Sequence, residues 1–159
     1  MQYPSNWTKV QPGAPLDNRK FAILVSFISP LTYDNGTSPT GNASAPFSSV
    51  NIGMHDLRPS GASRPSNVTL EEYNAFQSDS ISRQGANILE SDDMTLGGLL
   101  GHRISYTHGN NNDKEEKQTL QMWALKGDKV YHFIFTAHSD IFGQHLSTAQ
   151  NMAKSLQLK

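Results

Sequence analysis

Cysteine is absent from this chain. Its absence excludes disulfides, thiolate metal sites and cysteine nucleophiles together. Long apolar runs are absent as well: none approaches the roughly 18 residues needed to span a bilayer, and no signal peptide is visible. The sequence therefore predicts no transmembrane segment in this chain, although neither absence assigns a cellular compartment.

An excess of charge of one sign is also missing. The 13 basic and 14 acidic residues give a formal net charge of −1, and lysine and arginine are scattered without a basic stripe. Nucleic acids bind to clustered positive charge and to aromatic residues interleaved with it. The aromatic residues here lie at positions expected in a core, so we expect no nucleic-acid partner.

The length of 159 residues suffices for one domain that buries roughly 70% of its unfolded surface. We predict a single domain over residues 1–159. The chain opens directly in folded-looking sequence, so we expect a native leader or anchor that is not part of it. Four glycosylation sequons, at Asn6, Asn35, Asn42 and Asn67, are a small excess over the roughly two expected by chance. They give slight support to an extracytoplasmic location.

Residues 118–137 predict a β-hairpin. Two runs rich in aromatic and β-branched residues, 118–126 and 129–137, flank a break at Gly127-Asp128. The second run is apolar on both parities, which indicates a strand covered on both faces. An amphipathic helix follows, in which Ser139 or Asp140 is placed to cap the first N–H groups.

One further helix and several strands are predicted upstream. Residues 21–28 form the most continuous apolar run, which indicates a strand buried on both faces. Other strands are expected over 50–57, 87–93 and 100–108, with a tight turn at 96–98. Thr69 and Glu72 have the spacing of a capping box, in which each side chain accepts the other residue's backbone N–H. This motif predicts a helix over 70–82.

Histidine supplies the main candidate metal site. His102 and His132 could be neighbours on adjacent strands, and a divalent metal held by them is one hypothesis. The alternative is that each of the six histidines is either a hydrogen-bonded, half-buried residue or an exposed one. The absence of an H-E-x-x-H helix, and of any close His–carboxylate pair with zinc spacing, favours this alternative.

Motifs for catalysis are not found. The glycine-rich run 97–101 lacks the Lys-Ser/Thr ending of a phosphate loop, and no G-x-S-x-G elbow is present. No Ser/His/Asp set can be singled out among the 18 serines. The motifs therefore give no reason to expect an enzyme or a bound cofactor.

Taken in order, these elements resemble the PsbP family, the extrinsic photosystem II subunits and their non-photosynthetic relatives. The pattern is most similar to the small PsbP-like domain of exported prokaryotic and archaeal proteins. Short motifs along nearly the whole chain carry the resemblance: Tyr3-Pro4-Ser5-Asn6-Trp7, Phe27-Ile28-Ser29-Pro30, Thr69-Leu70-Glu71-Glu72-Tyr73, Ile104-Ser105-Tyr106, Thr119-Leu120-Gln121-Met122-Trp123 and Lys129-Val130-Tyr131.

The resemblance implies an α+β fold, an α-β-α sandwich with a central antiparallel sheet, and no enzymatic activity. It transfers no functional residue, because the matched positions look like core, cap and turn residues. We predict a monomeric, non-catalytic binding or scaffold domain that acts on a protein partner at a membrane surface. It would be extracytoplasmic, either secreted or tethered through a preceding segment. The alternative is a small-ligand or divalent-metal binding protein that uses the His102/His132 side of the sheet, and an unrecognised hydrolase is a third possibility.

Overall fold

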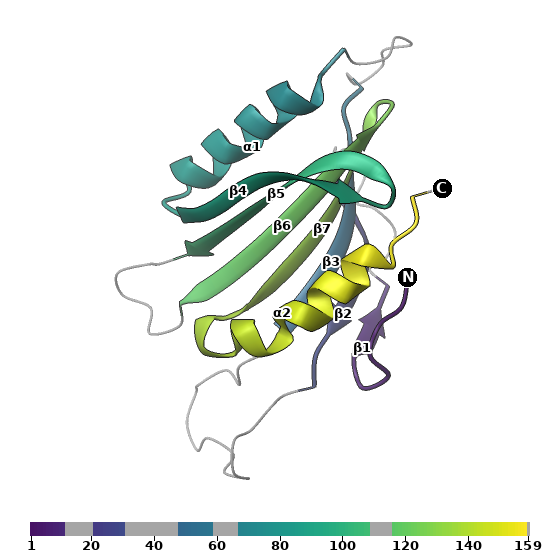
Figure 1. The fold of residues 1–159 in the computed structure, drawn as a ribbon, viewed down its shortest axis with the longest axis vertical. Coiled ribbons are helices and arrows are strands. Elements are labelled where there is room, and N and C mark those ends of the chain that lie inside the picture. The colour runs from purple at the N-terminus through teal and green to yellow at the C-terminus, as the bar shows by residue number, and fades with distance from the viewer. Residues whose placement is uncertain (12–20, 31–47, 59–66, 109–115, 159) are drawn as a thin grey trace.

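The computed structural model describes residues 1–11, 21–30, 48–58, 67–108 and 116–158, and these form one antiparallel sheet with two helices (Figure 1). The strand order across the sheet is β1-β2-β3-β7-β6-β5-β4. The elements are β1 (Thr8–Val10), β2 (Phe21–Ile28), β3 (Ser48–Asp56), α1 (Leu70–Arg83), β4 (Asn87–Leu96), β5 (Leu99–His108), β6 (Lys117–Lys126), β7 (Lys129–His138) and α2 (Ser139–Lys154).

The predicted hairpin β6–β7 lies at the centre of the sheet, and α2 covers one of its faces. Alternate residues of the hairpin point to this face, among them Leu120, Met122 and Phe133. They pack with Phe142 and Met152 of α2 in a cluster of buried apolar side chains. Alternate residues of the strands thus pack against the apolar face of α2, whose residues recur at steps of three and four, as the sequence predicts.

The other face of the same strands is covered by α1, which gives the predicted α-β-α sandwich. Trp123 of β6 and Val130 of β7 lie on this face, together with Ile104 of β5. They contact Tyr73 and Ile81, the two buried residues of α1. The expectation that the hairpin is covered on both faces is confirmed.

The capping box of α1 is confirmed. The Glu72 backbone N–H donates to Thr69 Oγ1 at 3.2 Å, and the Thr69 N–H donates to Glu72 Oε2 at 2.8 Å. The predicted cap of α2 is wrong. Its N-cap is His138, without a side-chain cap hydrogen bond. The Asp140 carboxylate instead binds the His138 ring, and the Ser139 N–H donates to the Glu116 carbonyl.

The prediction that residues 21–28 are buried on both faces is also wrong. They form strand β2, but Phe27 alone in it is buried. The reason is the position of β2 in the strand order of the sheet. β2 lies one strand from the edge of the sheet, and the three-residue strand β1 pairs only with its end, at Ser26–Ile28. Apolar composition alone does not tell whether a strand lies at the centre or near the edge of a sheet.

Within the described residues, the helices are too short or too polar to cross a membrane. The sequons at Asn6 and Asn67 lie at exposed positions, whereas Asn35 and Asn42 lie outside the described residues. The described ends of the chain meet, because the Gln2 N–H donates to Ser155 Oγ at 2.8 Å.

Candidate functional site

The face of the sheet beneath α1 carries a buried chain of hydrogen bonds centred on His132. The Tyr106 hydroxyl donates to Gln121 Oε1 at 3.3 Å, and Gln121 Nε2 donates to His132 Nδ1 at 3.1 Å. Nδ1 is therefore an acceptor, so His132 Nε2 carries the proton and donates to the Tyr73 hydroxyl oxygen at 2.9 Å. Tyr73 in turn is left to donate to His55 Nδ1 at 2.9 Å. Every step of the chain has one donor and one acceptor.

Burial keeps this chain of hydrogen bonds uncharged. His132 is 1% exposed. Desolvation lowers its pKa to about 3, with a further contribution from the charge of His55. Burial likewise raises the pKa of Tyr73 to about 12, against a hydrogen bond from Gln77. A general acid or base works best with a pKa near the ambient pH. His132 and Tyr73 are therefore suited to holding α1 in place on the sheet rather than to proton transfer.

The ring of Phe21 in β2 packs against two histidines of this chain of hydrogen bonds. Its ring lies 5.4 Å from the His132 ring, nearly perpendicular to it, and 6.5 Å from the His55 ring. The space for the ring comes from Gly53 on the neighbouring strand, where an added Cβ would fall 2.4 Å from Phe21 Cζ. A larger residue at position 53 would therefore require the Phe21 ring to move.

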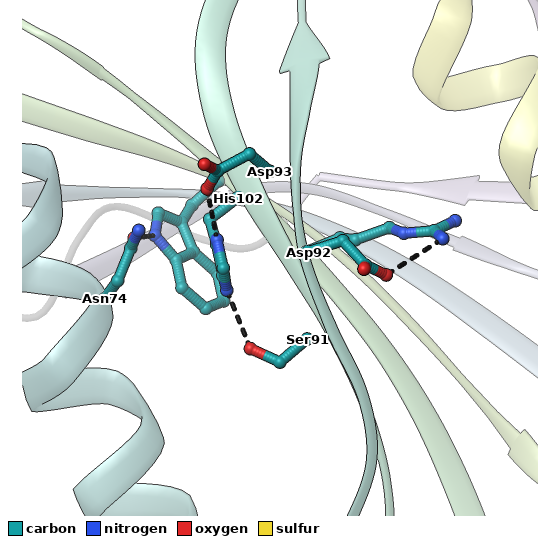
Figure 2. Close-up of polar contacts among 7 residues, drawn as sticks. Asn74, Ser91, Asp92, Asp93 and His102 are labelled. Atoms are coloured by element: carbon teal, nitrogen blue, oxygen red, sulfur yellow. Dashed lines mark hydrogen bonds and ion pairs between the residues drawn. The ribbon is translucent and has the colours of Figure 1, made fainter.

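His102 forms a second polar cluster on the same face (Figure 2). Its Nδ1 lies 2.8 Å from Asp93 Oδ1 and its Nε2 lies 2.8 Å from Ser91 Oγ. The ring packs on the buried indole of Trp123 at 5.4 Å, and the indole N–H donates to Asn74 Oδ1 of α1 at 2.8 Å. The cluster therefore ties the β4–β5 hairpin to the layer beneath α1.

This cluster is a Ser/His/Asp set that sequence reasoning did not single out. The order of its hydrogen bonds is that of a nucleophile, a base and an orienting acid. A working relay also needs a desolvated acid and donors aimed at an oxyanion. Asp93 is 74% exposed at its side chain. We therefore assign the set a structural role, in which cross-strand hydrogen bonds stabilise the pairing of β4 with β5.

The metal hypothesis supposed that His102 and His132 lie on adjacent strands. They lie on the same face of the sheet, but their strands are not adjacent. Both are register partners of Trp123, His102 from β5 and His132 from β7, so β6 runs between them. Two strand spacings separate the backbones by roughly 10 Å. Each ring nitrogen already has a hydrogen-bond partner. A metal held by both imidazoles stays a prediction, and it would require those hydrogen bonds to break.

The described residues contain no group of three or more potential metal-ligating side chains. Two acidic residues of β4 lie beside an arginine instead. Arg103 lies 3.1 Å from Asp92 and 3.9 Å from Glu90. The Asp92 side chain points to the side of β4 away from Ser91 and Asp93 (Figure 2).

A pocket of about 560 Å³ opens where α1 begins, next to the end of β3. This volume is within the range of small-molecule sites. Its floor reaches the buried chain of hydrogen bonds through Tyr73 and His55. The lining residues are His55, Leu57, Asn67, Val68, Glu72, Tyr73 and Phe76.

A second exposed feature is the apolar surface of β2, here called the β2 surface. Its side chains are between 36% and 46% exposed, and they are Phe21, Ile23, Leu24 and Ile28. Among the described residues, strand β1 ends its pairing at Ser26, so residues 21–25 have no strand partner on that side. The β2 surface therefore combines apolar side chains with backbone groups that no described strand pairs on that side.

Sequence reasoning named His102 and His132 but missed Tyr73, His55 and the two partners of His102, Ser91 and Asp93. A signal existed for part of this. A two-residue turn at Gly97-Gly98 pairs Leu96 with Leu99, and counting back along the hairpin places Asp93 opposite His102, as observed. No such signal existed for Tyr73, which is 59 residues from His132 and on a helix.

Comparison with known proteins gives matches at the level of structure. No family model matches the chain, and no curated protein matches it in sequence. Cyanobacterial PsbP from Synechocystis is 13% identical, with a TM-score of 0.57 over 99% of this chain and 84% of that protein. LpqN of Mycobacterium tuberculosis, involved in cell envelope biogenesis, is 12% identical, with a TM-score of 0.60 over 97% of this chain and 79% of that protein.

A protein of unknown function from Pseudomonas aeruginosa, PA94, is similar over 98% of this chain and 99% of its own length. It has a TM-score of 0.63 and 14% identity. At these identities the likeness concerns the fold. The chain has a PsbP-like α+β fold, as the order of its motifs predicted.

Proposed function

We propose that this chain is a non-catalytic, extracytoplasmic PsbP-like binding domain that acts as a monomer on a protein partner at a membrane surface. The observation that supports the proposal is the β2 surface. Exposed apolar side chains, beside backbone groups that no described strand pairs, are suited to an extended peptide that adds to the sheet as a further strand. Residues 21–25 would supply the backbone hydrogen bonds, and Ile23 and Leu24 the apolar contacts.

The similar structures support the location in part. LpqN is named for its involvement in cell envelope biogenesis, and cyanobacterial PsbP shares the same fold. The sequons at Asn6 and Asn67 are exposed, in agreement with that location. An extracytoplasmic domain of this kind would reach its membrane-surface partner by secretion or through a tether.

The test is affinity capture from membranes of the source organism, with Ile23→Lys and Leu24→Lys combined in one variant. Charged residues on an exposed strand oppose strand addition. We expect a specific protein to be recovered with the unchanged domain and to fall about tenfold or more with the variant. Leu100→Lys is the matched control, because Leu100 is 69% exposed on β5 and far along the sheet from β2. Equal recovery with both variants, or a full gene product found wholly in the cytosol, would refute the proposal.

The second candidate function is binding of a small ligand or a divalent metal on the α1 side of the sheet. The pocket at the start of α1 favours the small-ligand form. The metal form is tested by calorimetric titration with zinc, manganese and calcium. Heat that disappears in His102→Ala and in His132→Gln would support it, and no heat at micromolar concentrations would remove it.

A further inference from the structure

The pocket at the start of α1 leaves a large aromatic side chain uncovered. Phe76 is 59% exposed, although its ring lies 6.3 Å from the ring of buried Tyr73. Val68 lines the same pocket and is 37% exposed. A ligand that covers both side chains would remove apolar surface from water, which is the main driving force for binding in such pockets.

Glu72 is the one acidic residue in the described lining of this pocket. Its Oε2 accepts from the Thr69 N–H at 2.8 Å and from the Thr69 hydroxyl at 3.1 Å, whereas its Oε1 has no hydrogen-bond partner among the described residues. The hydrogen bonds from Thr69 lower the pKa of the Glu72 carboxyl. The side chain is therefore ionised at neutral pH, with one oxygen open to a ligand.

Among the described residues that line the pocket, none carries a positive charge to balance this carboxylate. Its described lining contains neither lysine nor arginine. Arg58, which follows the lining residue Leu57, is held in an ion pair by Asp56. The positive end of the α1 dipole, which would otherwise favour an anion, is already occupied by Glu72 through the capping box. What the pocket offers is a carboxylate beside aromatic rings, and both attract cations.

We propose that this pocket binds a small organic cation, with an apolar body against Phe76 and Val68 and an ammonium group beside Glu72. The inference rests on the small-ligand form of the second candidate function and adds the charge of the ligand to it. It is independent of the protein partner at the β2 surface.

The test is calorimetric titration with three probes of the same size and shape: phenylbutylamine, phenylbutanol and phenylbutyrate. We expect the amine to bind more tightly than the alcohol, and the alcohol more tightly than the carboxylate. Glu72→Gln should weaken the amine about tenfold and leave the alcohol unchanged, since glutamine still completes a capping box and the helix start is preserved. Glu71→Gln is the matched control, because Glu71 is an exposed carboxylate in the same helical turn that does not line the pocket.

Backbone amide shifts in NMR spectra locate the binding. We expect the amine to shift the first turns of α1 and the end of β3, and Phe76→Ala to weaken all three probes. Binding of the three probes with equal affinity, or the same response in Glu72→Gln and Glu71→Gln, would overturn the charge inference while leaving a small-ligand site in place. No binding by any probe at millimolar concentration would overturn the small-ligand site together with it.

Discussion

Beneath α2 the sheet is packed with aromatic and aliphatic side chains, whereas beneath α1 a chain of hydrogen bonds runs through a smaller apolar cluster. On the α2 side, Phe133 and Phe135 are 0% exposed, and the rings of Phe135 and Phe142 lie 4.9 Å apart. On the α1 side, the corresponding central position of β7 is His132, whose two ring nitrogens are both hydrogen-bonded. The same two strands therefore support two different kinds of interface.

The difference separates stability from binding. Apolar packing is non-directional and contributes roughly in proportion to buried area. A buried polar chain contributes little net energy when complete, but it fixes which groups face one another and is costly when broken. We infer that the α2 side supplies most of the folding energy, and that the α1 side holds its helix in one position around the pocket.

The largest expected effect is on the α2 side. Phe133→Ala removes a fully buried ring, and we expect the free energy of unfolding to fall by about 3–5 kcal/mol. Phe76→Ala, on the exposed rim of the α1 pocket, should change it by no more than about 0.5 kcal/mol. Urea denaturation of both variants measures the contrast. Similar losses in the two variants would contradict the burial of Phe133 and the exposure of Phe76.

The next effect concerns pH and the α1 side. The pKa of His132 lies at about 3 in the folded protein, below its ordinary value, because burial disfavours the charged ring. As the pH falls below about 6.5, the unfolded chain takes up a proton that the folded protein does not. The contribution of His132 is therefore fully present above about pH 6.5 and is lost progressively toward pH 3, by up to about 1.4 kcal/mol per pH unit.

His132→Leu provides the comparison, because leucine does not titrate. We expect the free energy of unfolding of the unchanged protein to fall more steeply than that of the variant between pH 6.5 and pH 5, by about 2 kcal/mol over that interval. The variant itself should be less stable at neutral pH by about 1–3 kcal/mol, since the Tyr73 hydroxyl and the Gln121 amide each lose their hydrogen bond to His132. Parallel pH curves would show that His132 is not buried in the neutral state.

More of the packing beneath α2 could be predicted from the sequence than of the hydrogen-bond chain beneath α1. The β6–β7 hairpin and α2 follow from local periodicity, and α1 follows from the Thr69 capping box, because these signals lie within a few neighbouring residues. The exposure of β2 depends on its place in the strand order, which no local pattern reports. The hydrogen-bond chain depends on where Tyr73 of α1 lands on the sheet, and only the folded structure brings it to His132.

A smaller effect tests how α1 is held. Thr69→Ala removes the hydroxyl that accepts the Glu72 N–H, and we expect a loss of about 1 kcal/mol, with Thr69→Ser nearly unchanged because serine caps equally well. Hydrogen exchange should show faster exchange in α1 and unchanged rates in α2. Equal acceleration in both helices would mean that the two layers open together, contrary to the comparison drawn between them.

The smallest expected effect is at the Ser91–His102–Asp93 cluster. Ser91→Ala removes one hydrogen bond at an exposed position of β4, so the free energy of unfolding should change by no more than about 0.5 kcal/mol. Asp93→Ala removes the other partner of the same ring and should have a comparably small effect, since Asp93 is largely exposed.

If the cluster were a catalytic relay, hydrolysis of an activated ester by the unchanged protein would exceed the buffer rate and be lost in Ser91→Ala. We expect equal rates in both proteins and the buffer, because the exposed acid cannot enforce the orientation that a relay needs.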